Sequence, residues 1–301
     1  MRPEPESVKR VAVVGTGTIG GGWAALFLAQ GLDVVATDPG AGAEAKLDAM
    51  IDQVWPALTS LGLAGLKARG RLEFVAKVAD AVDGAEFIQE SAPDREDLKV
   101  ALFAEIDRYA PPDSIIASSS SGFLPERLAA NCRHPGRCII GHPFAPSYLL
   151  PLVEIVGSAG NPKAVLDWSV AFYAGLGKQP LLLRKGIEGY IANRIQHVIL
   201  EEAARLVDAG VCDFKDVDDA VTGGVGLRWA FMGPALCYHF AGGRGGIDHS
   251  LAHFGWWGSE GSKQDIKESV AKIAGGRSME ELERWRDANL VALLKARKSM
   301  P

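Results

Sequence analysis

Short apolar runs alternate with longer amphipathic stretches over the first 185 residues of the chain. The short runs are rich in β-branched residues, which favour strands, while the longer stretches have helical spacing. Helices are expected over residues 19–30, near 97–109, and after Asn161, which we expect to cap a helix that Pro162 starts. The alternation predicts βαβ units and a mostly parallel sheet. Strands are expected at residues 11–14, 34–37, 72–75, 87–89, 114–117, 137–141, 152–156 and 179–184.

The pattern changes after Gly189. Apolar residues then recur at spacings of three and four, in YIANRIQHVILEEAARLVDAG and again in MEELERWRDANLVALLKARK, which is typical of amphipathic helices. The segment KGIEG at residues 185–189 marks the change. We therefore expect an α/β domain over residues 1–186 and an all-helical domain over residues 187–301.

Composition limits the classes of function. The net charge of −5 over 301 residues provides no basic surface for nucleic acid or an anionic membrane. The four cysteines form no CxxC pair, so we expect reduced thiols and no metal site. The N-terminal segment MRPEPESVKR has no apolar stretch, and no segment reaches the length of a membrane span. These features favour a cytoplasmic protein.

The first predicted strand runs into a glycine fingerprint, Gly15-x-Gly17-x-x-Gly20, which opens the first helix. This context indicates a Rossmann-type domain whose helix start, including Thr18 and Ile19, presents free N–H groups to a pyrophosphate. Asp38 ends the second strand, where its carboxylate suits the adenine ribose and repels a 2′-phosphate. NAD is therefore favoured over NADP. FAD fits the same fingerprint, but the residues that follow favour a nicotinamide.

Residues 141–156, GHPFAPSYLLPLVEIV, contain a candidate acid/base pair. His142 ends a predicted strand, at the edge where ligands of open α/β sheets bind, and a histidine exchanges protons near neutral pH. Glu154 lies in an apolar run, where a carboxylate needs a partner. A return strand beside His142 would bring it there, to orient the imidazole. The spacing alone leaves a purely structural pair equally open.

Two further polar groups are candidates for the same edge. The serine run in IIASSSSGFLPE follows another predicted strand, although such a run is often an ordinary turn. Asn193 and Arg194 begin the first C-terminal helix, where the amide is either a cap or a hydrogen-bond donor in a cleft.

Together the glycine fingerprint, the serine run, HPF…LVE and EGYIANR resemble the 3-hydroxyacyl-CoA dehydrogenase superfamily along the whole chain. The segments QESAPDREDLK, YLLPLVEIV, GLRWAFMGP and ELERWRDANL resemble its branch that acts on free hydroxy acids, the L-carnitine and L-gulonate (lambda-crystallin) dehydrogenases. The resemblance implies a Rossmann-type domain followed by a helical domain that forms a homodimer. It also implies site residues: His142 as base, Glu154 as its partner, Ser121 and Asn193 on the substrate oxygen, and Asp94 and Lys99 near the cofactor.

Substrate recognition is expected from the helical half. Arg228 lies among apolar neighbours in GLRWAFMGP, and its planar guanidinium suits a carboxylate; a plain surface arginine is the alternative. Some of the aromatic residues could form a cage for a quaternary ammonium, although core or interface packing is more usual. One position departs from the family pattern: Ala145 stands where HPxNP has asparagine. The aromatic candidates are Tyr148, Trp229, Phe231, Tyr238, Trp256 and Trp257.

The sequence thus predicts an NAD-dependent oxidation of the 3-hydroxyl of a small free L-3-hydroxy acid, of the carnitine or gulonate type. One alternative is a 3-hydroxyacyl-CoA dehydrogenase, which is less favoured because AGAEAKLDAMIDQVWPAL, after the second strand, has one lysine to meet a polyphosphate. The other is a non-catalytic, crystallin-like NAD-binding protein. The presence of all the predicted acid/base and oxygen-binding residues argues against that loss of chemistry.

Overall fold

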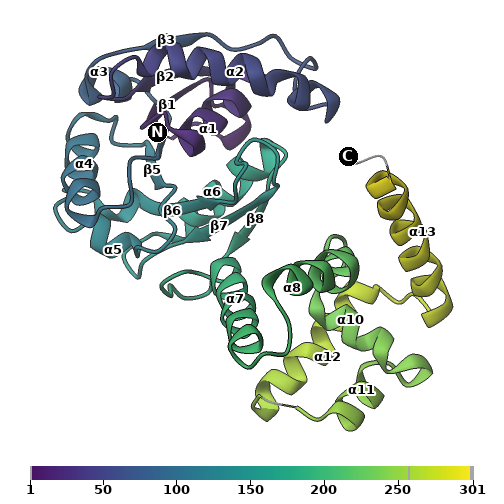
Figure 1. Cartoon of the computed structure of the whole chain (residues 1–301). Helices are drawn as coiled ribbons and strands as arrows, with labels where there is room; N and C mark the ends of the chain where they lie inside the picture. The colour runs from purple at the N-terminus through teal and green to yellow at the C-terminus, as the bar shows by residue number, and fades with distance from the viewer. Residues whose placement is uncertain (1, 257, 299–301) are drawn as a thin grey trace. The chain divides into compact units, whose positions relative to one another are not determined.

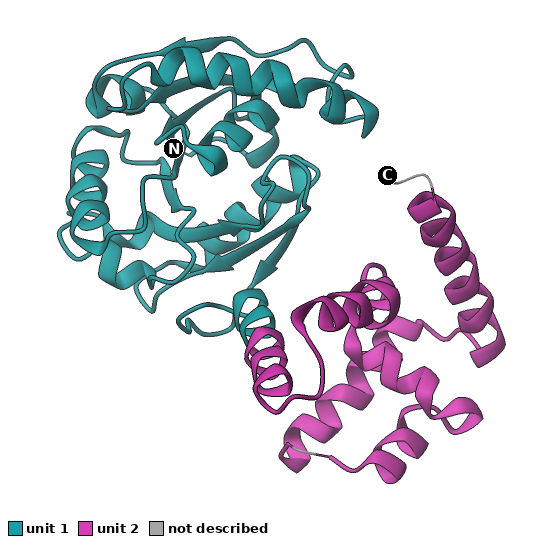
Figure 2. Cartoon of the chain, in the orientation of Figure 1, with its two compact units in different colours: residues 1–197 teal, residues 198–301 magenta. Residues whose placement is uncertain are grey.

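The computed structural model describes residues 2–256 and 258–298. The chain divides into two compact units, Met1–His197 and Val198–Pro301 (Figure 2). Within the described residues, no helix combines the length and the apolar character needed to cross a bilayer.

Unit 1 is built on an eight-stranded sheet in the order β3-β2-β1-β4-β5-β6-β7-β8 (Figure 1). All eight predicted strands are present, and the mostly parallel α/β fold is confirmed. Strands β1 to β6 are parallel to one another, while β7 pairs antiparallel with β6 and parallel with β8. The strands are β1 (Arg10–Val14), β2 (Asp33–Thr37), β3 (Leu72–Phe74), β4 (Phe87–Glu90), β5 (Ile115–Ser118), β6 (Cys138–Pro143), β7 (Leu152–Val156) and β8 (Gln179–Leu182).

Helices cover both faces of this sheet, so its central strands are apolar on both sides. Alternate residues of the central strands β1, β4, β5 and β6 enter one or the other of two apolar clusters. The first cluster packs against α1 (Thr18–Ala29), α2 (Ala43–Ser60) and α6 (Lys163–Gly175). The second packs against α3 (Val78–Val82), α4 (Glu96–Tyr109) and α5 (Pro125–Leu128). Because both faces of the sheet are buried, the polar side chains of the site lie at the carboxyl ends of the strands.

The expected cap of α6 is wrong. The helix begins at Lys163, Pro162 occupies the N-cap position, and no side chain caps it. The Asn161 amide instead donates to the carbonyls of Gly136 and Cys138, at 2.9 and 3.0 Å, while its oxygen accepts from the Ser158 N–H. Asn161 therefore ties the turn before the helix to the start of β6, a tertiary contact that capping statistics do not anticipate.

Unit 2 is helical, as predicted. The two units divide within α7, whereas the sequence pattern places the change of fold between residues 186 and 187. The start of α7 belongs with the sheet because the N–H groups of Ile191 and Ala192 bind Glu154 of β7. The helices are α7 (Ala192–Asp208), α8 (Phe214–Ala220), α9 (Gly226–Trp229), α10 (Pro234–Ala241), α11 (Gly246–Phe254), α12 (Glu260–Ala274) and α13 (Met279–Lys298), with a π-helical turn, η3 (Val221–Val225), between α8 and α9.

Candidate active site

The glycine fingerprint forms the tight turn between β1 and α1. Gly15 has a φ of +89°, and a Cβ there would lie 2.7 Å from the backbone nitrogen of Ala92. A Cβ on Gly20 would lie 1.8 Å from the Gly15 carbonyl oxygen, so this position needs glycine for close packing. Gly17, by contrast, faces open space. The loop thus packs tightly at Gly15 and Gly20 and is open at Gly17. A pyrophosphate needs such an accessible stretch of backbone.

The start of α1 carries the free donors that a dinucleotide phosphate requires. The Gly21 N–H donates to the Gly17 carbonyl at 2.7 Å, so the N–H groups of Thr18, Ile19 and Gly20 precede the first intrahelical bond. Asp38, just after β2, accepts from the Thr16 N–H at 2.8 Å and thereby holds its carboxylate beside the loop. These residues fit NAD, whose adenine ribose hydroxyls would bind Asp38.

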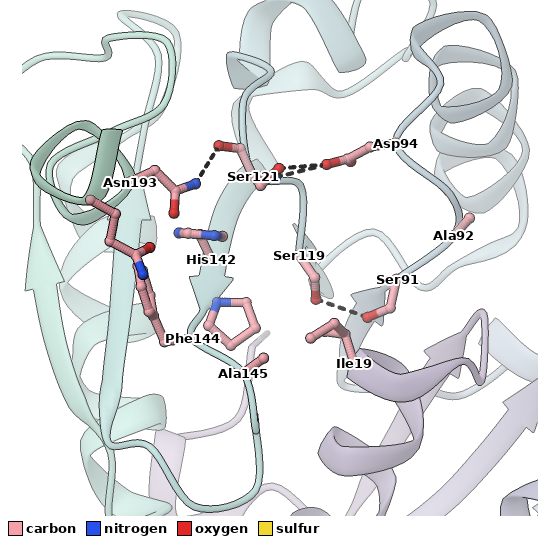
Figure 3. Close-up of a pocket in the computed structure, with 12 residues that line it drawn as sticks. Ile19, Ser91, Ala92, Asp94, Ser119, Ser121, His142, Phe144, Ala145 and Asn193 are labelled. Atoms are coloured by element: carbon pink, nitrogen blue, oxygen red, sulfur yellow. Dashed lines mark hydrogen bonds between the residues drawn. The ribbon is translucent and has the colours of Figure 1, made fainter. Parts of the chain in front are cut away.

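A cavity of about 470 Å³ opens beyond the ends of β4, β5 and β6 (Figure 3). Its walls come from α1, from the loops that follow these strands, and from the first turn of α7. All of its lining residues belong to unit 1, so the cavity does not depend on the placement of the helical unit. They are Ile19, Ser91, Ala92, Asp94, Ser119, Ser121, His142, Pro143, Phe144, Ala145, Asn193 and Gln196.

His142 and Glu154 face each other across the antiparallel pair β6 and β7, as register partners. Nδ1 of His142 lies 2.9 Å from Oε2 of Glu154. Oε1 of Glu154 accepts from the N–H groups of Ile191 and Ala192, at 2.9 and 3.1 Å. Burial alone would raise the pKa of Glu154, but these three hydrogen bonds outweigh it and hold the pKa below its ordinary value. The ionised carboxylate fixes the proton on Nδ1, so Nε2 is free to accept a proton.

Ser121 and Asn193 meet at the wall of the cavity next to His142. The Ser121 hydroxyl donates to Oδ2 of Asp94 at 2.8 Å, and its N–H donates to the same oxygen at 3.1 Å. Nδ2 of Asn193 donates to the Ser121 carbonyl at 3.1 Å, and Figure 3 shows both side chains beside His142. Burial would raise the pKa of Asp94, but the bonds from Ser121 and the nearby Lys99 ammonium keep it low.

Lys99 lies behind Asp94 and does not line the cavity. Its side chain is 1% exposed and donates to Oε1 of Glu90 at 2.7 Å, with Oδ1 of Asp94 3.5 Å away. Glu90 also accepts from the Ser118 hydroxyl and from the Ala92 N–H. The sequence reasoning missed Glu90, although a glutamate at the end of an apolar strand is a detectable signal of a buried ion pair.

Arg228 lies in unit 2, where it lines a separate cavity of about 280 Å³. Of the aromatic candidates, Trp229 and Tyr238 line this cavity with it, and Phe254, which the sequence reasoning missed, completes the aromatic wall. No hydrogen bond or ion pair of the Arg228 side chain occurs among the described residues. Within the same limits, no group of three or more metal-ligating side chains occurs.

The other aromatic candidates lie elsewhere. Phe231 packs edge-on against Trp285, with ring centroids 5.3 Å apart. Trp256 donates its ring N–H to the Ser259 carbonyl. Tyr148 packs against the apolar core of unit 1. Trp257 lies outside the described residues. Of the aromatic candidates, only Trp229 and Tyr238 therefore lie with Arg228 around one cavity.

Ser91 and Ser119 also line the main cavity. From the sequence, Ser119 was included only as part of the serine run and Ser91 was not named. Their hydroxyl oxygens are 2.8 Å apart, and each residue directly follows a strand. Their positions after β4 and β5 could have indicated them, because polar residues at the carboxyl ends of parallel strands meet at one edge.

A dinucleotide-binding loop and a carboxylate-oriented histidine at the same sheet edge define an NAD-dependent oxidoreductase. The chain belongs to the 3-hydroxyacyl-CoA dehydrogenase family. The family's NAD binding domain matches residues 10–186, and its C-terminal domain matches residues 189–275.

Relatives of known activity match nearly the full chain. An L-carnitine dehydrogenase of Pseudomonas aeruginosa is 46% identical over 96% of this chain and 94% of its own. One of Pseudomonas putida is 44% identical over 97% and 95%. Among solved structures, a 5-formyl-3-hydroxy-2-methylpyridine 4-carboxylic acid 5-dehydrogenase, an NAD⁺-dependent dismutase, has a TM-score of 0.76 at 26% identity, covering 98% of this chain and 100% of that one.

Proposed function

We propose that the protein oxidises the 3-hydroxyl of L-carnitine, or of a closely similar free 3-hydroxy acid, to the ketone. The buried His142–Glu154 pair at the cavity is the observation that carries the chemistry. The nearly full-length similarity to L-carnitine dehydrogenases supports this substrate over L-gulonate and over an acyl-CoA. When bound, NAD⁺ accepts the hydride from the carbinol carbon.

His142 is the general base of this proposal. Its Nε2 accepts the hydroxyl proton as the substrate oxygen becomes a carbonyl, and Glu154 stabilises the imidazolium that results. Because Nδ1 is bound to a carboxylate, the ring cannot rotate away or take the other tautomer without breaking a buried hydrogen bond. The protein thus presents one defined acceptor to the substrate.

Asn193 and Ser121 hold the substrate oxygen. One amide hydrogen of Asn193 is used by the Ser121 carbonyl, and the second remains for the substrate. The Ser121 hydroxyl now donates its one hydrogen to Asp94, so it donates to the substrate oxygen only when that hydrogen bond is exchanged. Asp94, supported by Lys99, therefore acts as a positioning residue for Ser121.

Arg228 is proposed to bind the substrate carboxylate. Its exposed guanidinium shares a cavity with the rings of Trp229, Tyr238 and Phe254. A guanidinium binds a carboxylate through two parallel hydrogen bonds, and aromatic faces attract a quaternary ammonium. L-Carnitine carries both groups, whereas L-gulonate lacks the cation, so this cavity favours the zwitterion.

We further propose that the working form is a homodimer assembled through the helical domain that the sequence predicts for residues 187–301. Ile191, Ile195 and Val198 are 43%, 51% and 65% exposed. Their spacing of four and three places them on one face of the α7 segment, and a second copy of the chain would remove that apolar surface from water. The cytoplasmic location remains a prediction from the sequence.

The function is tested by NADH production with L-carnitine, L-gulonate and 3-hydroxybutyryl-CoA as separate substrates. L-Carnitine is expected to give the highest kcat/KM. His142→Gln is expected to lower kcat on it by about 10²- to 10⁴-fold, the usual contribution of a general base. His134→Gln, which changes a histidine 60% exposed on a loop of the same unit, serves as the matched control. Unchanged NADH production in His142→Gln would overturn the mechanism.

Carboxylate recognition is tested separately with Arg228→Met and Arg228→Lys. Loss of a bidentate contact is expected to raise KM for L-carnitine by about tenfold or more in both variants, because an ammonium does not reproduce the planar fork. The dissociation constant of NAD⁺ should stay as in the wild type. A KM that Arg228→Met leaves unchanged would remove Arg228 from the substrate site.

A further inference from the structure

A chain of buried hydrogen bonds runs from the core of unit 1 into the cavity, and the catalytic pair does not use it. The Tyr173 hydroxyl donates to Oε1 of Gln89 at 2.7 Å, and Nε2 of Gln89 donates to Oγ of Ser119 at 2.8 Å. Oγ of Ser119 lies 2.8 Å from Oγ of Ser91. Tyr173 and Gln89 are fully buried, while the two serines line the cavity.

The direction of this chain is fixed at its buried end. Burial raises the pKa of Tyr173, so its hydroxyl remains a donor. Oε1 of Gln89 must therefore face Tyr173, which turns the amide N–H groups towards Ser119. Gly141 permits this arrangement, because a Cβ there would lie 2.0 Å from the Tyr173 hydroxyl oxygen.

Counting hydrogens shows what reaches the cavity. Ser91 and Ser119 together carry two hydroxyl hydrogens, and the bond between them uses one. Among the described residues, no side chain or carbonyl accepts the other. Since Gln89 already donates to Ser119, the pair has a surplus donor directed at the cavity, and it calls for an acceptor oxygen on a ligand.

The position of the serines indicates which ligand this is. In the order β1-β4-β5-β6, they follow the two strands between the glycine loop and His142. Ser91 is also adjacent to that loop, since a Cβ on Gly20 would lie 3.1 Å from its own Cβ. A dinucleotide that extends from the loop towards His142 must cross the ends of β4 and β5, and Figure 3 shows the serine pair beside Ile19 at this place.

We propose that the Ser91–Ser119 pair, oriented by Gln89 and Tyr173, binds the carbonyl oxygen of the nicotinamide carboxamide and so fixes which face of the ring is presented to the substrate. The carboxamide is the polar substituent of that ring and offers the required acceptor. The neighbouring Ala145 has no side-chain hydrogen-bonding group, so the serines supply the polar contact at this wall. The inference rests on NAD as cofactor and not on the identity of the hydroxy acid.

The test measures binding of three dinucleotides, by quenching of tryptophan fluorescence, with no hydroxy acid present. NAD⁺ and its 3-acetylpyridine analogue both carry the carbonyl oxygen, whereas the thionicotinamide analogue has sulfur, a poorer acceptor. Ser119→Ala is expected to weaken binding of the two oxygen-bearing forms by about five- to tenfold, the worth of one hydrogen bond. Binding of the sulfur analogue should change by less than about twofold, because the bond it loses is weak.

Tyr173→Phe keeps the buried ring and removes only the hydroxyl, so it tests the relay even where Ser119→Ala folds poorly. It is expected to weaken binding of the two oxygen-bearing dinucleotides by about two- to threefold and to spare the sulfur analogue. The loss is smaller because Gln89 remains but is no longer held in one orientation. Ser119→Thr, which keeps a hydroxyl, should retain the preference for the oxygen-bearing forms. Ser169→Ala, a buried serine on the same helix as Tyr173 that donates to the Val165 carbonyl, is the matched control.

Equal weakening of all three dinucleotides by Ser119→Ala and Tyr173→Phe would show a merely structural role and overturn the proposal, as would no weakening of any. Because the readout is binding in the absence of substrate, an inactive enzyme with L-carnitine leaves this result unaffected. The two proposals therefore fail separately.

Discussion

Glu154 accepts three hydrogen bonds on one buried side chain, and in the proposed mechanism these bonds orient His142 as the base. Its two oxygens accept from an imidazole on one side and from two backbone N–H groups on the other. An amide cannot replace it. If a glutamine turns its oxygen to His142, its NH₂ opposes the N–H groups of Ile191 and Ala192, and the reverse orientation presents a donor to Nδ1.

We therefore expect Glu154→Gln to lower kcat by about 10²- to 10⁴-fold while KM for the hydroxy acid changes little. His142 would stay in position, but its proton would no longer be held on Nδ1. Steady-state kinetics with NAD⁺ and L-carnitine measure this, and thermal unfolding shows whether the fold is kept. A Glu154→Gln enzyme with wild-type kcat would make the pair structural.

The same carboxylate links stability to pH. Its pKa in the folded protein lies below the ordinary value of 4.5, despite burial, because of the three hydrogen bonds. The contribution of Glu154 to the free energy of unfolding is therefore fully present above pH 4.5. It is lost as the pH falls through the pKa of Glu154 in the folded protein. We expect the difference in unfolding free energy between wild type and Glu154→Gln to shrink from pH 7 towards pH 3. Urea titrations measure it, and a difference that stays constant would contradict the ionised pair.

At the scale of elements, Lys178 fastens the loop between β6 and β7, which carries Ala145. Its ammonium donates to the carbonyls of Ser147 and Leu150 and lies 5.3 Å from the centroid of the Trp23 ring. The Ser147 hydroxyl in turn donates to the Ile19 carbonyl of α1. The buried Lys178 ammonium thus holds the loop in place, and the hydrogen bond from the Ser147 hydroxyl joins the loop to α1, the helix of the glycine fingerprint.

Burial lowers the pKa of Lys178 from 10.5 to about 8. Between these values the unfolded chain binds more protons than the folded protein, so this group makes stability rise with pH there and has no pH-dependent effect well below pH 8. Against Lys178→Met, the wild type should gain at most about 3 kcal/mol of unfolding free energy from pH 8 to 10.5. Denaturant titrations at both pH values measure this gain, and a flat difference would contradict the buried charge.

At the scale of the whole molecule, the proposed homodimer depends on the exposed apolar face of α7. Ile195→Asp with Val198→Asp places two charges on that face and is expected to convert a dimer to a monomer in sedimentation experiments, because buried unpaired carboxylates oppose association. Leu66→Asp, at a residue 85% exposed on unit 1, is the control and should leave the mass unchanged. A double variant that remains dimeric would place the interface elsewhere.

The sequence alone determined the fold class and the kinds of chemistry present. All eight strands, the helical second half and the glycine loop could be predicted, because periodicity and glycine placement are local properties. Asn161 shows the limit of local rules: it matches a capping pattern, yet its amide bonds reach the start of β6.

Only the tertiary structure decided which polar groups meet. The antiparallel register of β6 and β7 makes His142 and Glu154 partners, whereas the sequence indicated only that a return strand would bring them together. Burial placed Lys99 behind Asp94 instead of in the cavity, and strand order brought Ser91 and Ser119 together from segments far apart in the chain. A hydrogen bond forms only when donor and acceptor from such segments are placed to within a few tenths of an ångström. Local sequence does not specify these distances; the packing of the whole sheet does.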